Sequence, residues 1–442
     1  MVQTRVVALA QRHQRSVQKT YSRVRCELPA TLNRSRDEES IHMTASPLTV
    51  GIVADEFLDP ALGRLGGFGW AARRFAEVFN RSPELGVRPV YLSGAPHRAR
   101  RGATKPLTSN GTRLVRLGNR LPINMLRLLG QRVDVLITID YRRSYDRVLK
   151  ALPFTPVITW VRDPRTPADI EKMYSLRIPG REGEKPKGLH AQDTTKLAAH
   201  VKGAWFVKRK VLLANKMPHM IAKDEETYGL PPSPFVLPNP SLFDYEQTSV
   251  QKSERPSVAF LARLDPIKRP WLFVDLARRF SGVDFLMMGQ AHFEGEGGWA
   301  PSDIPSNLHL LGYLSSEEKR DVLARAWVLV NTSIHEETPV SVLEALAHET
   351  PVISYEDWGK LVARHGITIG QHYGTGEQGL ADLEAALREL LTNNEKRAEL
   401  GARGRVYVES THNDEQFLAA FWELCNVAGV APSTAPRALE QS

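Results

Sequence analysis

The sequence is poor in cysteine and contains no long apolar run. Cys26 and Cys425 are the only cysteines among the 442 residues, which excludes a disulfide scaffold and a CxxC motif and is typical of a reducing compartment. No stretch approaches the roughly 18 apolar residues that a membrane-spanning helix needs. Residues 1–42 also lack the apolar segment of a secretory signal peptide. We therefore expect a cytoplasmic protein without a signal peptide or a transmembrane segment, whose contact with a membrane is at most peripheral.

Two catalytic signatures are missing as well. No Gly-x-x-x-x-Gly-Lys-Ser/Thr loop occurs, which argues against an NTPase of the P-loop class. No Gly-x-Ser-x-Gly elbow occurs either, which argues against a serine hydrolase.

Basic residues outnumber acidic ones, and the excess is uneven. The formal net charge is +8, and residues 1–42 carry eight Lys/Arg against four Asp/Glu. Residues 97–132 carry nine Lys/Arg and no acidic residue. Two interpretations fit these segments: a solvated basic face, or a field that attracts phosphates or anionic lipid. Neither segment has the interleaved aromatic residues of a single-strand nucleic-acid platform, so a membrane surface is favoured over nucleic acid.

Residues 1–46 precede the first expected strand. Up to Cys26 the segment is rich in arginine and has no acidic residue, a composition that is also found in organelle transit peptides. Met43 stands just before the apolar run at 47–53. We therefore favour a mobile or wrongly assigned extension.

The rest of the chain has the pattern of two α/β domains. Its composition, 42% hydrophobic and 24% charged, is globular, and its length suits two or three domains. Short apolar runs alternate with helical patterns, as in βαβ units around parallel sheets. Strands are expected at 48–54, 88–93, 133–139, 156–161 and 211–215, then at 258–264, 285–289, 308–313, 327–333 and 351–355. Helices are expected at 68–80, 123–131, 380–391, 395–407 and 414–425.

Several helix ends are marked by specific residues. Ser315 and Glu318 form a capping-box pattern. Pro270 and Pro339 suit the first position of a helix, where the missing N–H costs nothing, and Thr338 suits the N-cap before Pro339. A proline-rich stretch at 231–240, followed by polar residues to 256, predicts the boundary between the domains.

Two cations follow the first expected strand of the second half. Arg263 comes directly after the apolar run 258–262, and Lys268 precedes the helix that Pro270 opens. Ligands bind beyond the carboxyl ends of parallel strands, and a helix N-terminus with an arginine and a lysine suits a diphosphate. The competing interpretation is an exposed pair near Asp265, worth roughly 0–1 kcal/mol.

Two glutamates flank the start of a later helix. Glu336 lies in the loop before it, and Glu344 lies on it at the border of an apolar arc formed by Val340, Leu343, Leu346 and Ala347. A carboxylate in such a place costs several kcal/mol unless a partner satisfies it. A pair of ribose hydroxyls would do so, whereas a solvated glutamate at the margin of the arc needs no ligand.

Taken together, these elements resemble the retaining glycosyltransferases of family 4, which have the GT-B fold. Glu336, seven intervening residues and Glu344 resemble the E-x7-E motif of that family. Arg263 and Lys268 resemble its Arg-x4-Lys diphosphate element, and the likeness extends in order over 258–354. No Asp-x-Asp triplet occurs, which argues against the other large glycosyltransferase fold, where such a motif holds a divalent ion.

The resemblance implies a role for each matching residue. Arg263 and Lys268 would hold the donor diphosphate without a metal ion, Glu336 the donor sugar and Glu344 the ribose. The remaining donor-binding positions would act largely through their backbone groups: Gly312, Tyr313 and Leu314 at the nucleobase, and Glu337, Thr338, Pro339, Val340 and Ser341 at the sugar and phosphate. The family often has Gly-Phe-Gly or Gly-Phe-Pro where this chain has Glu337-Thr338-Pro339, which places an extra carboxylate near the sugar. Glu349 stands where the family usually has glycine at the end of the helix.

The first half resembles the family less closely. Gly66, Gly67 and Phe68 match its glycine-rich loop near the phosphates and the acceptor, although a tight turn without a ligand also fits. Arg162 and Asp163 follow the expected strand at 156–161, where many members have a histidine. We weigh a contact with the acceptor or donor sugar against a structural ion pair there. Asn239 matches a turn residue of the interdomain hinge. His219, His309 and His335 have no metal-ligand spacing and are interpreted as ordinary polar residues.

The resemblance thus implies two Rossmann-like, doubly wound domains facing a cleft. We expect an acceptor-side domain at 47–240, a linker at 241–256, a nucleotide-sugar-binding domain at 257–410, and a helix in 411–442 that crosses back before the tail. The expected activity is transfer of a sugar from a nucleoside-diphosphate sugar to a hydroxyl of a glycan, lipid-linked or small-molecule acceptor, with retention of configuration and no cofactor. The alternatives are a catalytically silent sugar-nucleotide-binding scaffold, and a basic binder of membrane surfaces or nucleic acid.

Overall fold

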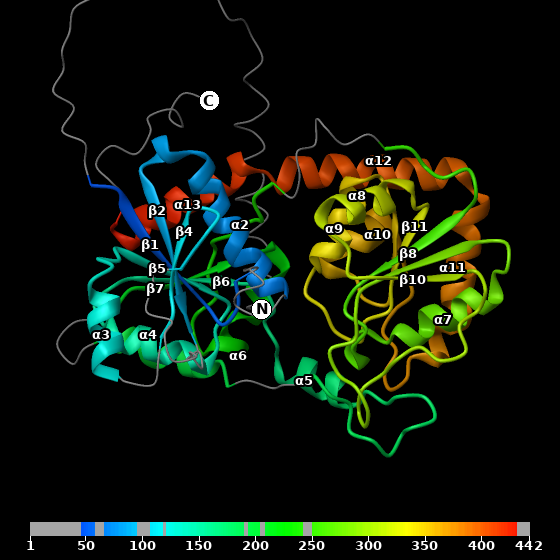
Figure 1. Cartoon of the computed structure of the whole chain (residues 1–442), viewed down its shortest axis with the longest axis horizontal. Helices are drawn as coiled ribbons and strands as arrows, with labels where there is room; N and C mark the ends of the chain where they lie inside the picture. Colours follow the sequence, from blue (N-terminus) through cyan, green and yellow to red (C-terminus); the bar gives the residue numbers. More distant parts are fainter. Residues whose placement is uncertain are drawn as a thin grey trace, which may run out of the picture.

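The computed structural model describes residues 46–57, 66–94, 107–117, 121–189, 193–203, 208–241 and 250–430. The expected N-terminal extension, the tail from residue 431, and parts of the linker and of the basic segment 97–132 lie outside these ranges. The described residues form two α/β domains, each built around its own sheet (Figure 1).

The first sheet has seven strands in the order β3-β4-β2-β1-β5-β6-β7, parallel except for the β3–β4 pair. The strands are β1 (Leu48–Ala54), β2 (Val87–Ser93), β3 (Leu107–Ser109), β4 (Thr112–Val115), β5 (Val135–Ile139), β6 (Val157–Val161) and β7 (Val211–Asn215). The sequence predictions are confirmed for all of them except β3 and β4. These two form a hairpin around Asn110 and Gly111, both at positive φ, and each is too short to show strand periodicity.

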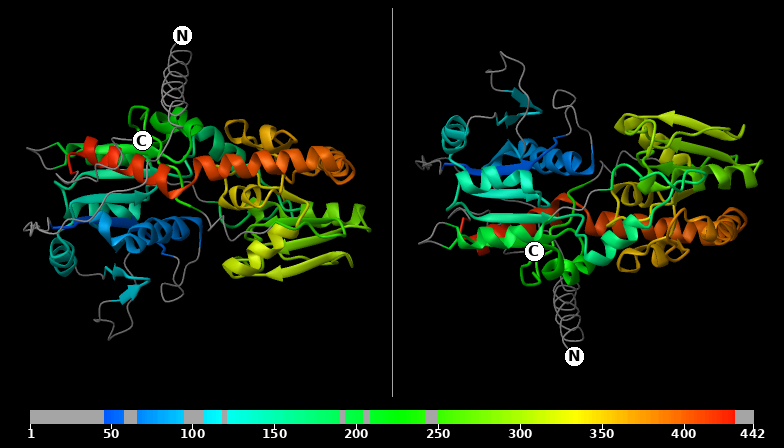
Figure 2. Two further views of the ribbon diagram at one scale, coloured as in Figure 1. Left: turned by 90° about the horizontal axis from the view of Figure 1, so that it is seen from above. Right: turned by 90° about the horizontal axis from the view of Figure 1, so that it is seen from below.

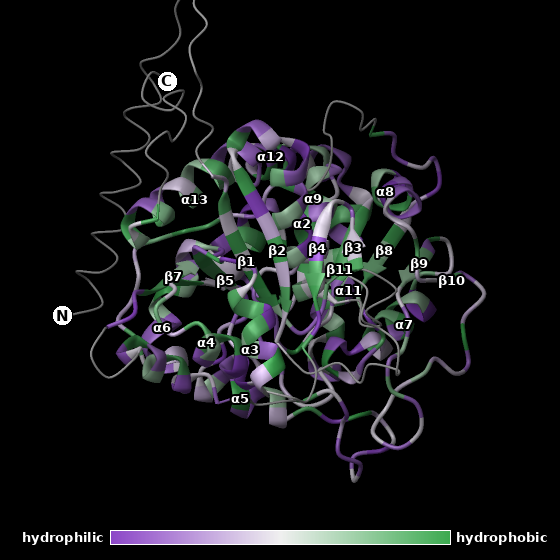
Figure 3. Cartoon of the chain, turned by 60° about the vertical axis from the view of Figure 1, so that its left-hand side comes forward, coloured by the Kyte–Doolittle hydropathy of each residue, from purple (hydrophilic) through white to green (hydrophobic). Residues whose placement is uncertain are grey.

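The second sheet has six parallel strands in the order β10-β9-β8-β11-β12-β13. The strands are β8 (Ser257–Leu261), β9 (Asp284–Met288), β10 (Leu308–Gly312), β11 (Val328–Asn331), β12 (Val352–Ser354) and β13 (Gly366–Thr368). Only β13, three residues at the edge of the sheet, was not predicted. Figure 3 shows hydrophobic residues along strands of both sheets and many hydrophilic residues along α12.

Helices cover both faces of each sheet. The helices of the first domain are α2 (Gly67–Arg81), α3 (Leu121–Leu129), α4 (Asp146–Ala151), α5 (Pro167–Tyr174) and α6 (Asp224–Tyr228). The later helices are α7 (Pro270–Arg279), α8 (Ser316–Arg325), α9 (Val340–Ala347), α10 (Leu361–His365), α11 (Leu380–Thr392), α12 (Asn394–Thr411) and α13 (Asp414–Ala428). None of the helices within the described ranges has the length and apolar character needed to cross a bilayer.

Most predicted helix ends are confirmed, and one is wrong. Pro270 opens α7, and Ser315 with Glu318 makes both hydrogen bonds of a capping box before α8. The prediction of Thr338 as N-cap and Pro339 as first helical residue is wrong, because α9 begins at Val340 with Pro339 as its N-cap. Thr338 has a φ of 48°, in the left-handed region, and Pro339 is extended, so the helix starts one residue later than expected.

The chain crosses between the domains more than once. The long α12 lies along the second domain, and α13 continues it across the first (Figure 2). There the rings of Phe417 and Phe421 lie 5.5 and 5.6 Å from the ring of Phe75. In the other direction, Leu176 and Ile178, which follow α5, are buried in the core of the second domain. These crossings fix how the carboxyl ends of the two sheets face each other.

Candidate active site

A cavity of about 810 Å³ lies between the two domains. It brings together seven of the predicted residues: Gly66, Gly67, Phe68 and Asp163 from the first domain, and Arg263, Lys268 and Glu336 from the second. The other predicted residues, namely Arg162, Gly312, Tyr313, Leu314, Glu337, Thr338, Pro339, Val340, Ser341 and Glu344, are not part of its described lining.

Lys268 and Glu336 form an ion pair in this cavity. Lys268 ends the short 3-10 helix η7 (Pro266–Lys268) just before α7, and Glu336 lies in the loop after β11. The Oγ of Ser333 donates to Oε1 of Glu336 at 3.1 Å, and the backbone N–H of Glu336 donates to Oε2 of Glu356 at 2.7 Å. The Glu336 carboxylate is therefore held by the Lys268 ammonium, which lines the cavity, and by the buried Ser333 hydroxyl.

Arg263 lies two residues beyond the end of β8 and is partly open to solvent, with its side chain 47% exposed. Its guanidinium lies 3.0 Å from the buried Asp265 carboxylate and 3.3 Å from Nδ1 of His292. The planar donor fork of arginine suits an anion that enters the cavity. Arg263 and Lys268 thus place two cations beside the N-terminus of α7, where the helix dipole also favours negative charge.

Glu344 lies on α9 and is buried. Its Oε1 lies 2.5 Å from Nζ of Lys319 on α8, and its side chain is only 5% exposed. The positive charge of Lys319 offsets the free-energy cost of burying the Glu344 carboxylate next to the apolar face of α9. Glu344 therefore has a charged partner in this structure without a bound ribose.

The last residue of β10 and the loop after it carry the positions expected at a nucleobase. Gly312 has a φ of 66°, and its carbonyl accepts a hydrogen bond of 2.8 Å from the N–H of Gly289. Tyr313 is 61% exposed, and Leu314 packs against the core. Val340 and Ser341 form the first turn of α9.

Glu337 points to the first domain. Its carboxylate lies 3.2 Å from Nε2 of His219 and forms an ion pair with Lys223. Burial alone would raise the pKa of Glu337, but the hydrogen bond from His219 and the charge of Lys223 hold it below its ordinary value. Nζ of Lys216 donates to the carbonyls of Glu337 and Thr338 at 2.6 and 2.8 Å. The carboxylate that the sequence analysis placed near the sugar is thus an interdomain contact.

Arg162 and Asp163 do not pair with each other. Arg162 is buried with its guanidinium 4.5 Å from the centre of the Trp160 ring, and it donates to Oδ1 of Asn239 at 2.8 Å. Burial lowers the pKa of Arg162 to about 9. Asp163 instead pairs with Arg165 at 2.6 Å and faces His335. Only Asp163 reaches the cavity.

The glycine-rich loop lies at the start of α2. A Cβ atom on Gly66 would lie 2.6 Å from the carboxylate of Glu56, whereas one on Gly67 would meet nothing within 4 Å. The guanidinium of Arg142 stacks over the Phe68 ring at 4.7 Å. Glycine at position 66 therefore allows the close approach of Glu56, which also lines the cavity.

Sequence reasoning missed two residues that line the cavity, His335 and Asp140, and three that contact the loop carrying Glu336, namely Lys216, Asp169 and Lys223. His335 lines the cavity next to Glu336, but it was interpreted as an ordinary polar residue. Lys216 and Asp140 each come directly after a strand, β7 and β5. A polar residue at the carboxyl end of a parallel strand is the signal that would have found both. Asp169 on α5 and Lys223 have no such signal, because only the tertiary fold brings them to His335 and Glu337.

Residues 244–407 match the family model described as Glycosyl transferases group 1. This part of the chain is thus similar to a group 1 glycosyl transferase domain. A search of curated proteins finds no significant sequence match.

Several solved structures share the two-domain architecture over most of the chain. Sucrose-phosphate synthase from Thermosynechococcus elongatus is 15% identical, with a TM-score of 0.63, and the match covers 87% of this chain and 100% of that one. Anabaena HepE in complex with UDP-glucose is 12% identical, with a TM-score of 0.60 over 86% of this chain and 99% of that one. A glycosyltransferase from Rickettsia africae is 12% identical, with a TM-score of 0.58 over 87% and 99%. At such low identity these likenesses show the fold, which is GT-B.

Proposed function

We propose that the chain is a retaining glycosyltransferase that moves a sugar from a nucleoside-diphosphate sugar to an acceptor hydroxyl. The observation that carries this proposal is the convergence of Arg263, Lys268 and Glu336 on one cavity whose opposite wall is formed by Gly66 and Asp163. In this proposal the first domain, about 47–240, takes the acceptor, and the second, about 257–410, takes the donor after a linker at 241–256. The helix at the start of 411–442 joins the first domain.

Each charged group has a defined task in the proposed reaction. Arg263 and Lys268 bind the diphosphate and stabilise the negative charge that grows on it as the glycosidic bond breaks. Glu336 accepts hydrogen bonds from hydroxyls of the donor sugar, and Asp163 does so from the opposite wall. Glu344 binds the ribose hydroxyls after exchanging Lys319 for them.

The sugar is transferred with retention of configuration. The acceptor oxygen forms its bond to the anomeric carbon on the face from which the diphosphate leaves. The transition state resembles an oxocarbenium ion, and an oxygen of the leaving diphosphate takes the proton of the acceptor hydroxyl. The cations that bind the donor thereby also lower the barrier, because the charge they stabilise is largest in the transition state.

Peripheral contact with an anionic membrane is a second part of the proposal. Helix α3 exposes four large apolar side chains: Ile123, Met125, Leu126 and Leu129. Arg127 is exposed on the same helix, and Arg143, Arg147 and Lys150 are exposed on or beside the neighbouring α4. Apolar side chains flanked by cations are typical of surfaces that enter the headgroup region of anionic lipid. Such a surface would bring a lipid-linked acceptor close to the first domain.

Thermal unfolding with a panel of UDP-, GDP- and ADP-sugars tests the proposed function. HepE was solved with UDP-glucose, which makes UDP-glucose the first donor to try. We expect one donor class to raise the unfolding temperature of the wild type and not that of Glu344→Ala. Glu384→Ala, which changes a carboxylate paired with Arg279 and Arg388 away from the cavity, should keep the shift. Release of nucleoside diphosphate in the presence of an acceptor then separates an enzyme from a silent binding protein.

A further inference from the structure

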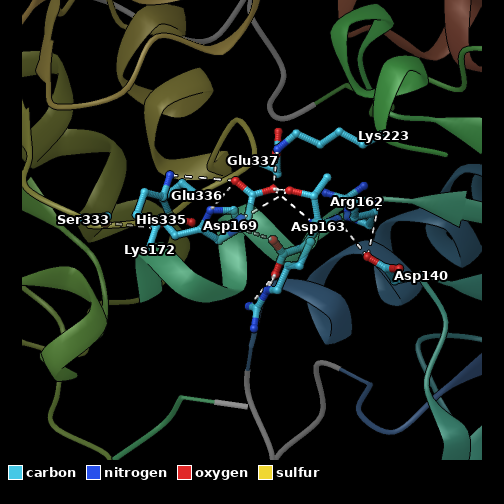
Figure 4. Close-up of polar contacts among 12 residues, drawn as sticks. Asp140, Arg162, Asp163, Asp169, Lys172, Lys223, Ser333, His335, Glu336 and Glu337 are labelled. Atoms are coloured by element: carbon cyan, nitrogen blue, oxygen red, sulfur yellow. Dashed lines mark hydrogen bonds and ion pairs between the residues drawn. The ribbon is translucent and has the colours of Figure 1, made fainter. Parts of the chain in front are cut away.

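The loop that carries Glu336 is attached to the first domain on both sides of that residue (Figure 4). On one side, Nε2 of His335 lies 3.2 Å from Oδ1 of Asp163, and its Nδ1 lies 3.7 Å from Oδ1 of Asp169. On the other side, the Glu337 carboxylate pairs with Lys223. Glu336 is thus flanked by two residues whose partners belong to the other domain.

These contacts close into a ring. Nζ of Lys223 donates to Oδ2 of Asp169 at 2.8 Å as well as to Glu337. His335, Asp169, Lys223 and Glu337 therefore follow one another around the ring, and the two middle members come from the first domain. The carboxylates of Asp169 and Glu337 thus alternate around the ring with the His335 imidazole and the Lys223 ammonium.

The side chains of the ring are shielded from solvent, so the interactions between their charges are strong. The side chains of His335 and Glu337 are 2% and 3% exposed, and those of Asp169 and Lys223 are 14% and 26% exposed. In such surroundings the removal of one partner leaves the other uncompensated, which costs far more than at an exposed pair. A single substitution is therefore expected to loosen the whole ring.

Asp169 is itself held firmly. Its carboxylate accepts hydrogen bonds from the backbone N–H and the hydroxyl of Thr166, and the Thr166 hydroxyl accepts from the N–H of Asp169, which closes a capping box at the start of α5. The carbonyls of Glu337 and Thr338 are fixed in turn by Lys216. The ring thus ties the loop that carries Glu336 to Asp169 and Lys223 of the first domain.

Three members of the ring, Asp169, Lys223 and Glu337, are not part of the described lining of the cavity, whereas His335 and Glu336 are. These three residues therefore influence a ligand in the cavity by positioning the loop that carries His335 and Glu336. Glycine, which the family that this chain resembles often has at the position of Glu337, offers no side chain for such a contact. The ring therefore depends on a residue by which this chain departs from the family pattern.

We propose that Asp169, Lys223 and Glu337 are positioning residues, which together with His335 hold Glu336 at the cavity, so that the first domain sets the geometry of the donor site in the second. The inference rests on the proposed function of Glu336. Displacing a substrate-positioning group by about 1 Å can cost up to roughly a hundredfold in rate. Arg263 and Lys268 lie outside the ring, so donor binding should change much less than turnover.

A double-mutant cycle with Lys223→Met and Glu337→Gln tests this coupling, with UDP-glucose as the first donor. We expect each single variant to lower kcat about tenfold, which corresponds to about 1.4 kcal/mol of barrier, while KM for the donor changes little. The double variant should also be about tenfold slower, because either substitution opens the same ring. If the double variant is about a hundredfold slower, the two substitutions act independently, and the proposal is overturned. Unchanged turnover in both single variants would overturn it as well. Lys223→Arg keeps the cation and should restore most of the turnover.

Hydrogen exchange without a donor separates this proposal from the proposed function. Backbone amides of residues 334–342 should exchange faster in either variant than in the wild type, whereas those of β8 should not change. The matched control pair, Arg279→Met and Glu384→Gln, removes an exposed ion pair between α7 and α11 and should leave exchange and turnover as they are. If the chain transfers no sugar, the exchange measurement still tests whether the ring holds the loop. Unchanged exchange of residues 334–342 in both Lys223→Met and Glu337→Gln would overturn that claim.

Discussion

Lys268 and Glu336 are separated by 68 positions in the sequence, yet they form an ion pair that lines the cavity between the two domains. A cation for a diphosphate and a carboxylate for a sugar hydroxyl must lie close together in a donor site, because the glycosidic bond joins the two parts of the donor. In the proposed reaction the pair therefore marks where the breaking bond lies, with Arg263 on the diphosphate side.

Arg263→Ala should slow the reaction strongly. By analogy with the loss of a donor that stabilises developing negative charge, we expect a cost of roughly 3–4 kcal/mol in transition-state stabilisation, about two to three orders of magnitude in kcat. The measurement is the initial rate of nucleoside diphosphate release. Arg255→Ala removes an arginine near the other end of β8, where Arg255 pairs with Asp284, and should have normal turnover. Normal turnover in Arg263→Ala would refute the assignment.

Leu126→Glu should weaken binding to anionic vesicles. Leu126 is 72% exposed on α3, and burial of a leucine in the headgroup region contributes roughly 1.5–3 kcal/mol. We expect at least a tenfold loss of partitioning in co-sedimentation with vesicles of phosphatidylcholine and phosphatidylglycerol. Leu310→Glu changes an exposed leucine on β10 and serves as the control. Equal binding of both variants and the wild type would exclude α3 as the contact.

Stability should fall as the pH drops below about 6.5, partly because of His412. Burial, with Lys216 and Arg162 nearby, lowers the pKa of His412 from 6.5 to about 3. Its Nδ1 accepts a hydrogen bond of 3.2 Å from the N–H of Asn239. Because the folded state keeps this ring neutral, protons bind first to the unfolded chain and favour it increasingly from pH 6.5 down to about 3.

Denaturant unfolding of His412→Asn at two pH values measures this effect. The asparagine carbonyl can still accept the hydrogen bond but does not titrate. Between pH 7 and pH 5 the free energy of unfolding of the wild type should fall by about 2 kcal/mol more than that of the variant. An equal fall in both proteins would show that His412 does not titrate as described.

The sequence predicted the fold well because apolar runs and helix caps are local signals. β1 and β7 match the predicted strands to the residue, and Ser315 caps α8 as expected. The hairpin of β3 and β4 was missed because its strands have only three and four residues. The prediction for Thr338 failed because its left-handed φ delays α9, and a backbone conformation of that kind is hard to read from a threonine.

The candidate site was predictable only in part. Arg263, Lys268 and Glu336 stand in a recognisable order along one domain, so their convergence on one cavity could be anticipated. The partners of Glu337 could not, since His219 and Lys223 come from the other domain and only the packing of the two domains brings them near. The partner of Glu344, Lys319, lies on a neighbouring helix for the same reason.

A crystal structure of the chain with UDP tests the central claim most directly. We predict that the diphosphate lies between the guanidinium of Arg263 and the ammonium of Lys268, at the N-terminus of α7, and that the ribose hydroxyls reach the Glu344 carboxylate. Nucleotide bound away from the cavity, or bound there with both cations turned from the phosphates, would contradict the account.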